Sequence, residues 1–291
     1  MVNRRKFLTQ AAASGVVVAA FVPVACATRT PGAAVVQTVQ GSLAASKLGF
    51  TLTHEHICRV PLKIFGDRTN ALAKAIDRAK MARDEGVDTI VDVTTFDVGR
   101  DIRFGEEVSR KSGMQIVACT GQHLFAPESF NERSVEEITE LFVREIERGI
   151  EDTDIRAGVI KVASRSDSMT SAEKNVFKAA ARASKATGVP IETHTHARRR
   201  GGEAQVEIFE AEGVSAASVS LGHSDDTDDL RYLIGLAKRG YTLGMDHIYR
   251  GMADGEKVPW QRRAEYIKQL IDAGFVDVSF ERLDLRRRRA G

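Results

Sequence analysis

The sequence has no excess of charge of either sign. Its 42 Lys and Arg residues nearly balance 40 Asp and Glu residues, giving a formal net charge of +2. Proteins that bind nucleic acids carry a strongly positive surface, so this balance gives no electrostatic case for a nucleic-acid partner. With 43% hydrophobic and 28% charged residues, the 291-residue chain has the composition of an ordinary globular protein of one large or two small domains.

The apolar segment near the N-terminus is too short and too rich in alanine for a stable membrane span. It follows Arg4-Arg5, and together they predict a twin-arginine signal peptide over residues 1–30, hence export to the periplasm. Residues 25–27 fit cleavage by a signal peptidase, whereas residues 24–26 form a weak lipoprotein box. Membrane association is therefore expected only if Cys26 is lipidated. The alternative to a signal peptide is a basic, amphipathic N-terminal segment that is not cleaved or exported.

Cysteine is scarce, with three residues in the whole chain. Export is expected to remove or lipidate Cys26, which leaves Cys58 and Cys119. Both lie in or beside apolar, strand-like runs, where cysteine behaves as a small hydrophobic side chain. The sequence favours two buried free thiols over a disulfide.

A repeated unit follows the signal segment: a short β-branched run, a loop and a helical pattern that ends in glycine. Capping boxes at Ser134–Glu137 and Thr170–Glu173 mark the starts of two of the helices. The predicted strands are residues 49–56, 87–95, 115–120, 157–163, 190–194, 218–223 and 241–247.

The alternation of strand and helix predicts the fold class. It is typical of a parallel sheet, and seven or eight units over about 250 residues match the size of an α/β protein of the (β/α)8 TIM-barrel type. We expect the barrel to occupy residues 31–276, with the eighth β/α unit incomplete or aberrant. A doubly wound open sheet is the alternative.

Histidines gather at the ends of the predicted strands, which in a barrel converge on the mouth that holds the active site. His54 and His56 are two residues apart on a strand, so both imidazoles point to one face and can chelate a zinc-like ion. A single strand-end histidine is more often a hydrogen-bonded core residue, but a series of five is not explained that way. The five are His54, His56, His194, His223 and His247.

Lys161 lies inside the apolar run Val159-Ile-Lys-Val-Ala163, where a charged amine is costly unless it is paired or modified. The sequence offers no carboxylate partner nearby. Asp226 and Asp246 lie close to strand-end histidines, and such carboxylates can orient imidazoles or relay protons.

The segment Gly49-Phe-Thr-Leu-Thr-His-Glu-His-Ile-Cys58 closely resembles the first-strand motif of bacterial phosphotriesterases, a branch of the amidohydrolase superfamily. The resemblance covers about residues 35–276. Further similar segments are Thr89–Asp97, Ile155–Ala163, Gly222–Asp229 and Asp246–Ile248.

This resemblance implies a site with two divalent metal ions, typically zinc, and a hydroxide between them that attacks a small-molecule ester. Homodimers are usual in the family. By the resemblance, His54 and His56 bind the more buried ion, a carboxylated Lys161 bridges the two ions, His194 and His223 bind the exposed ion, and His247 and Asp226 occupy proton-relay positions.

Two segments depart from the family pattern. His123 and Leu124 stand where efficient organophosphate hydrolases carry Trp-Phe. Residues 277–291 lack the Ser-Asn-Asp motif that supplies the family's last ligand. A one-base shift in codons for Phe280–Asp284 would restore it, so we predict an aberrant, frameshifted tail; the alternative is that Asp284 is the surviving ligand.

The expected function is metal-dependent hydrolysis of phosphotriesters, in particular aryl dialkyl phosphates. A lactonase or carboxylesterase that uses the same two-metal site is one alternative, because the same hydroxide can attack a carbonyl carbon. The other alternative is an inactive zinc-binding remnant, which follows from the missing ligand.

Overall fold

The computed structural model describes most of the chain after the N-terminal segment. Contacts divide the chain into Met1–Gly32 and Ala33–Gly291, and only the second unit contains described residues. The predicted signal peptide and Asp284 lie outside them and stay predictions. The described residues are 34–59, 66–165, 168–253, 257–275 and 278–280.

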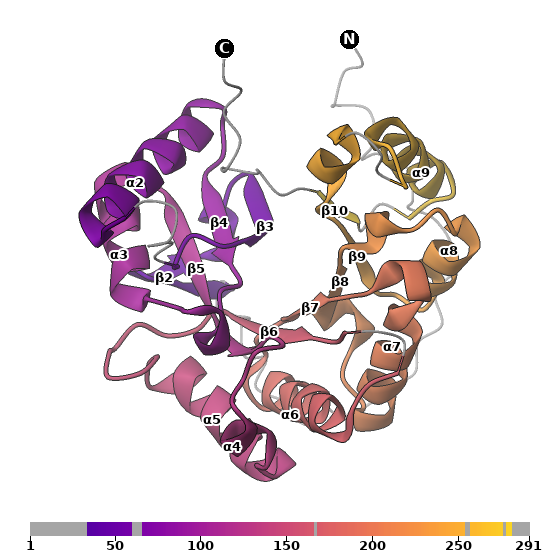
Figure 1. The fold of residues 1–291 in the computed structure, drawn as a ribbon, viewed down its shortest axis with the longest axis horizontal. Coiled ribbons are helices and arrows are strands. Elements are labelled where there is room, and N and C mark those ends of the chain that lie inside the picture. Colours follow the sequence, from indigo (N-terminus) through magenta and orange to yellow (C-terminus); the bar gives the residue numbers. More distant parts are fainter. Residues whose placement is uncertain (1–33, 60–65, 166–167, 254–256, 276–277, 281–291) are drawn as a thin grey trace, which may run out of the picture. The chain divides into compact units, whose positions relative to one another are not determined.

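The second unit is built on an eight-stranded parallel sheet that curls into a barrel (Figure 1). Each strand pairs with the strand that follows it in the chain, from β3 to β10. A doubly wound sheet would reverse its strand order at one point, so the TIM-barrel prediction is confirmed. The strands are β3 (Thr51–Glu55), β4 (Thr89–Asp92), β5 (Gln115–Gln122), β6 (Val159–Ala163), β7 (Ile191–His194), β8 (Val219–Gly222), β9 (Thr242–Met245) and β10 (Val278–Phe280).

The barrel is nearly closed. The three-residue strand β10 pairs in parallel with β9, with Val278 opposite Leu243 and Phe280 opposite Met245. Within the described ranges, β10 lies close to β3 but forms no ladder with it. Among the described residues, the eighth strand thus spans three residues and pairs on one side only, in line with the expected incomplete eighth unit.

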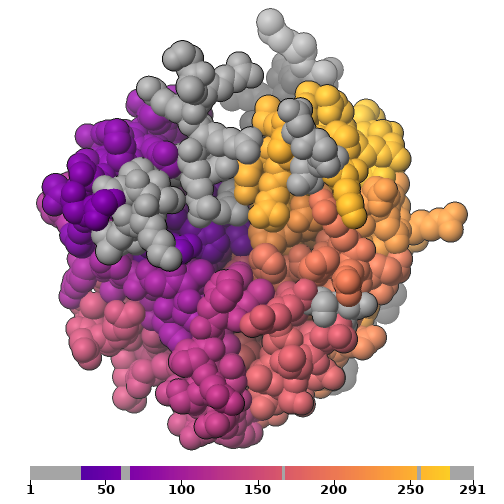
Figure 2. Space-filling view, viewed as in Figure 1, coloured from indigo at the N-terminus to yellow at the C-terminus, as the bar shows by residue number. Residues whose placement is uncertain are grey.

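Helices surround the barrel (Figure 1), and in the space-filling view the colours succeed one another around the molecule in chain order (Figure 2). The two predicted capping boxes begin α5 and α6, and Gly188 and Gly213 end helices in the left-handed conformation. None of the described helices combines the length and apolar character needed to cross a membrane. The helices are α2 (Arg68–Asp84), α3 (Ile102–Ser112), α4 (Glu128–Asn131), α5 (Val135–Glu147), α6 (Ser171–Thr187), α7 (Gly201–Glu212), α8 (Leu230–Lys238) and α9 (Trp260–Asp272).

A two-stranded antiparallel hairpin precedes the barrel, which the sequence analysis did not predict. Strands β1 (Val35–Thr38) and β2 (Gly41–Ala44) pair with each other, and β1 lies beside β5. Val39 N donates to Ile116 O at 2.8 Å, which joins the hairpin to the amino-terminal end of the barrel.

Short 3-10 helices follow several strands at their carboxyl ends, where the site lies. They place the residues that come directly after the strands around the barrel mouth. These turns are η2 (Phe96–Val98), η3 (Ala197–Arg199), η5 (Ser224–Asp226) and η6 (Ile248–Met252); η1 (Ala45–Lys47) and η4 (Ala216–Ser218) lie elsewhere.

Candidate metal centre

The predicted metal ligands come from separate strands and meet inside the carboxyl end of the barrel. A β-bulge between Leu52 and Glu55 interrupts the pairing of β3 with β4 at His54, which is buried. Lys161 lies in β6 and is fully buried, at 0% exposure. His194 ends β7, and His223 follows β8 in the left-handed conformation.

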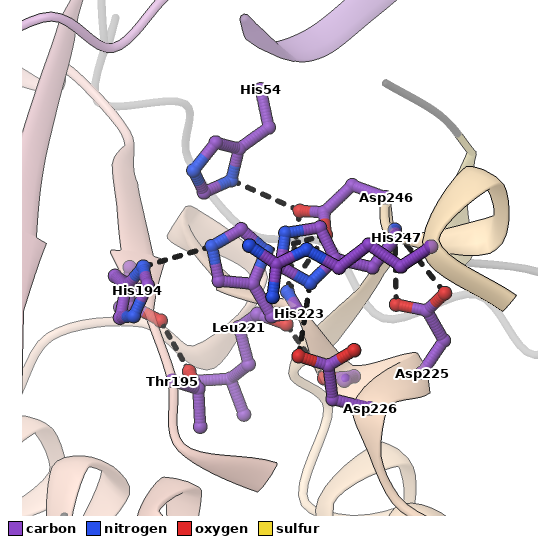
Figure 3. A network of polar contacts seen from close by, with 12 residues as sticks. His54, His194, Thr195, Leu221, His223, Asp225, Asp226, Asp246 and His247 are labelled. Atoms are coloured by element: carbon purple, nitrogen blue, oxygen red, sulfur yellow. Dashed lines mark hydrogen bonds and ion pairs between the residues drawn. The ribbon is translucent and has the colours of Figure 1, made fainter. Parts of the chain in front are cut away.

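Two pairs of nitrogen atoms form the centre of the cluster. Lys161 Nζ lies 2.7 Å from His54 Nε2. His223 Nε2 lies 2.9 Å from His194 Nδ1 (Figure 3). Two nitrogens bound to one zinc ion at about 2.0–2.1 Å would be roughly 3.4 Å apart in tetrahedral geometry. Both pairs are closer than that, at hydrogen-bonding distance. The residues nevertheless fit a metal site by their chemistry, because three imidazoles converge beside Lys161 in a buried interior and imidazole is a usual zinc ligand.

Asp246, directly after β9, connects the two pairs. Its Oδ2 lies 3.0 Å from His54 Nδ1, and its Oδ1 lies 2.7 Å from His223 Nδ1. A carboxylate that accepts the Nδ1 hydrogen fixes the tautomer and leaves Nε2 for a metal ion. His54, His223 and Asp246 also offer three ligand atoms within 4.8 Å of one another, which could themselves hold an ion.

The imidazoles in this cluster are held neutral. Burial is the main cause that lowers the pKa of His223 to about 4, and burial also lowers the pKa of His54 and His194 well below the usual value. Metal ligation requires the neutral imidazole, so this environment is compatible with the predicted ligand role.

His56 lies farther from the others. Its ring centroid is 6.1 Å from that of His54, and its Nδ1 lies 3.1 Å from Thr94 Oγ1. Asp92 accepts from the backbone N–H groups of Ile57 and Cys58, which fixes the chain just beyond His56. The predicted first-strand pair is thus on one side of the barrel, with His56 nearer its rim.

The predicted proton-relay residues form a pair of their own. His247 Nδ1 lies 2.9 Å from Asp226 Oδ2, and the His247 ring stacks on His223 with centroids 3.7 Å apart. His247 Nε2 is buried and has no hydrogen-bond partner among the described residues. Although burial opposes it, His247 and Arg263 hold the pKa of Asp226 well below its usual range.

Arg263 of α9 supports this pair, and the sequence analysis did not identify it. Its guanidinium donates to Asp225 Oδ2 at 3.0 Å and to Asp226 Oδ1 at 2.9 Å. Asp225 in turn accepts from the backbone N–H of His247. A helix that begins after the β9 loop therefore positions two carboxylates that follow β8.

Glu192 supplies the carboxylate that the sequence lacked near Lys161. It comes from the adjacent strand β7, where it is opposite Lys161 in the sheet register. Its Oε1 lies 3.0 Å from His54 Nδ1. Burial raises the pKa of Glu192 to about 8, and the Lys161 amine opposes that rise. The one sequence signal for Glu192 was its position two residues before His194, which places both side chains on the same face of the strand.

The rim beside His194 carries the first departure from the family pattern. The His123 ring lies 5.0 Å from that of His194 and stacks on Phe125, which is 66% exposed. The Asp97 carboxylate fixes this loop by accepting from the backbone N–H groups of His123 and Phe125. A polar imidazole therefore stands at the edge of the cluster.

Comparison with known proteins identifies the family to which this chain belongs. The model of the phosphotriesterase family matches residues 34–290. The chain belongs to the phosphotriesterase family.

The relatives that this chain resembles carry different names. The chain is 34% identical over 249 residues to an aryldialkylphosphatase of Saccharolobus solfataricus, covering 81% of this chain and 76% of that protein. It is 35% identical over 256 residues to a phosphotriesterase homology protein of Mycobacterium tuberculosis (82% and 77%). It is 28% identical over 247 residues to an N-acetyltaurine hydrolase of Xenopus tropicalis (72% and 71%).

The phosphotriesterase family is a family of hydrolases, and this chain carries a candidate metal-binding cluster. Glycines leave room for that cluster. A Cβ at Gly222 would lie 2.8 Å from both Glu192 Oε1 and His54 Cε1, and a Cβ at Gly244 would lie 3.1 Å from Asp246 Oδ2. Side chains at these positions would displace the residues that surround the candidate ligands.

Proposed function

We propose that this chain hydrolyses phosphotriesters, in particular aryl dialkyl phosphates, at a site for two divalent metal ions, zinc by family resemblance. One observation carries the proposal: the paired approach of Lys161 to His54 and of His223 to His194, at 2.7 and 2.9 Å. These residues come from four different strands, and a shared ion accounts for their convergence in a buried interior.

The proposed ligand sets follow the family resemblance. His54 and His56 would hold the more buried ion, and His194 and His223 the more exposed ion. Lys161, carboxylated on Nζ, would bridge them, which removes the cost of a buried ammonium group. When bound, the ions would lower the pKa of water and polarise the ester oxygen.

The chain's own residues would handle the proton released in the reaction. His247 Nε2 is buried and faces no other partner in the described part of the chain, so it can take a proton from the reacting water. The Nδ1 contact with Asp226 holds the ring in the required tautomer and orientation. Arg263 keeps Asp226 ionised and in place.

Hydrolysis at a carbonyl carbon, as in a lactonase or carboxylesterase, is the second candidate. His123 at the rim favours it, because an imidazole can hydrogen-bond a polar acyl group, whereas a large apolar leaving group prefers aromatic contacts. A relative named N-acetyltaurine hydrolase supports the same view. A zinc-binding remnant without turnover is the third candidate, based on the absence of the Ser-Asn-Asp motif that supplies the family's last ligand.

Parallel assays on an aryl dialkyl phosphate and an acyl lactone distinguish the three candidates. Turnover of the phosphate supports the proposal, turnover of the lactone alone supports the second candidate, and bound zinc without turnover supports the third. Lys161→Ala is expected to abolish two-metal binding, measured as metal per chain. Lys174→Ala, an exposed lysine in α6, is the control. Unchanged metal content in Lys161→Ala would exclude the bridging role.

We also propose, from the sequence alone, export to the periplasm by the twin-arginine route and assembly as a homodimer. Cell fractionation of a strain that expresses the full chain tests the first, with Arg4→Lys/Arg5→Lys as the export-deficient control. Light scattering on the purified protein tests the second; a monomer mass at micromolar concentration would contradict it.

A further inference from the structure

Glu192 has no role in the function proposed above, yet it is buried inside the barrel beside the candidate ligands. Its residue exposure is 4%. Alternation along β7 places Glu192 on the same face as His194, one layer deeper in the barrel. A buried carboxylate is costly without polar partners, so its contacts indicate what it does.

The surroundings of Glu192 differ on its two sides. Toward the amino-terminal end of the barrel it lines a cavity of about 570 Å³, whose walls include Val91, Val117 and Val159. Toward the mouth, Glu192 Oε1 lies 3.0 Å from His54 Nδ1. Lys161 is the residue opposite Glu192 in the register between β6 and β7. The carboxylate is thus directed at the metal centre from below.

His54 Nδ1 lies between two carboxylates, but one of these is already shared. Asp246 is 2.7 Å from His223 Nδ1 and also accepts from the backbone N–H of His223 at 3.0 Å. A neutral imidazole has only one N–H to donate. Asp246 Oδ2, the oxygen that lies 3.0 Å from His54 Nδ1, also accepts from the backbone N–H of His223 at 3.2 Å, whereas Glu192 Oε1 lies at the same 3.0 Å from His54 Nδ1 and has no contact with His223 among the hydrogen bonds of the described residues.

We propose that Glu192 is the positioning residue for His54: it accepts the Nδ1 hydrogen and directs Nε2 toward the metal centre beside Lys161. Each of the two imidazoles then has its own carboxylate, Glu192 for His54 and Asp246 for His223. Gly222 makes the arrangement possible, because a Cβ at that position would lie 2.8 Å from Glu192 Oε1. The inference rests on the proposed two-metal function.

The test replaces Glu192 and measures metal binding, not only activity. Glu192→Leu keeps similar bulk but removes the acceptor, and we expect metal affinity to fall roughly 10–100-fold, as for other residues that orient ligands. Glu192→Gln keeps an acceptor oxygen and is expected to recover most of the affinity. Thr242→Val, on β9, two strands away from Glu192 and lining the same cavity, is the matched control and should bind as the wild type does.

Two readouts are needed: metal per chain after dialysis against buffered zinc, and the visible spectrum of the cobalt(II)-loaded protein. The cobalt spectrum reports ligand geometry, which a change in stability alone would not alter. Wild-type zinc affinity and an unchanged cobalt spectrum in Glu192→Leu would overturn the inference. If Glu192→Leu does not fold, Glu192→Asp is the test variant, because its shorter side chain moves the carboxylate oxygen away from His54. Wild-type zinc affinity in Glu192→Asp would also overturn the inference.

The failure of this inference can be told apart from the failure of the proposed function. If the wild-type chain takes up no zinc or cobalt, the two-metal function is wrong, and the positioning role of Glu192 falls with it. If the wild type binds two ions and the Glu192 variants bind them equally well, only the role of Glu192 is wrong.

Discussion

The guanidinium of Arg263 lies 2.9 Å from the carboxylate of Asp226, although the two residues are 37 positions apart in the chain. Arg263 is fully buried, at 0% exposure, and also donates to Asp225 and to the carbonyl of Val258. A single side chain thereby connects α9 to the turn after β8 and, through Asp226, to His247.

Arg263→Met should destabilise the protein strongly. It leaves the carboxylates of buried Asp225 and half-buried Asp226 without their cation. Removing one partner of a buried pair typically costs about 3–5 kcal/mol. Urea unfolding followed by circular dichroism measures the loss. Arg262→Met is the control, because the adjacent Arg262 pairs with Glu265 at the surface and should change stability by about 0.5 kcal/mol or less. Equal effects of the two substitutions would show that the buried pairs carry no net stability.

His247→Asn should reduce turnover without loss of metal. The substitution removes the proton acceptor, and general-base residues typically contribute about 10²–10⁴-fold to the rate. The measurement is kcat on the preferred ester together with metal per chain. His196→Asn, two residues after β7 and without a proposed role, should keep its rate. If His247→Asn loses its metal ions instead, His247 acts on the ligands and not on the proton.

Cys58 and Cys119 should not react with thiol reagents in the folded protein. Both are buried and free, which confirms the expectation of two unpaired thiols. Burial raises the pKa of both thiols well above the usual value, so the reactive thiolate is negligible at pH 8. Titration with a disulfide reagent on the chain without residues 1–30 should detect no thiol before denaturation and two afterwards. Fast reaction of either thiol in the native protein would contradict this burial.

Gly121→Ala and Gly86→Ala should differ although both glycines have positive φ. At Gly86, with φ of 92° and nothing within 4 Å of an added Cβ, only backbone strain opposes alanine, at about 1–2 kcal/mol. At Gly121, an added Cβ would lie 1.9 Å from the carbonyl oxygen of Lys161. We therefore expect Gly121→Ala to cost more stability and to lower metal content, because the Lys161 backbone must move. Equal metal content in both variants would show that β6 can shift without disturbing the centre.

The sequence allowed the architecture to be predicted because each repeat carries its own local signals. The hydroxyl and carboxylate of the capping boxes at α5 and α6 lie three residues apart, so their interaction depends on little else. Strand ends were less predictable: residues 241–247 were expected to form one strand, but β9 ends at Met245. Asp246 and His247 leave the ladder there because their side chains are held by residues from other strands.

The β1–β2 hairpin and the bulge in β3 were not predicted. The hairpin has strands of only four residues, too short for a clear alternation, and it is held by contact with β5. The bulge adds one residue to one strand of a pair, which depends on the partner strand β4 as much as on the β3 sequence.

The sequence by itself determined the order of the strands, the helix starts and the placement of histidines and Lys161 at or near strand ends. These features depend on local spacing and on a fold whose strands converge at one mouth. Only the tertiary structure decided which carboxylate faces which imidazole. Glu192, Asp246 and Arg263 approach their partners across neighbouring strands or from a distant helix, and the sheet register and side-chain packing that bring them together are absent from any local pattern.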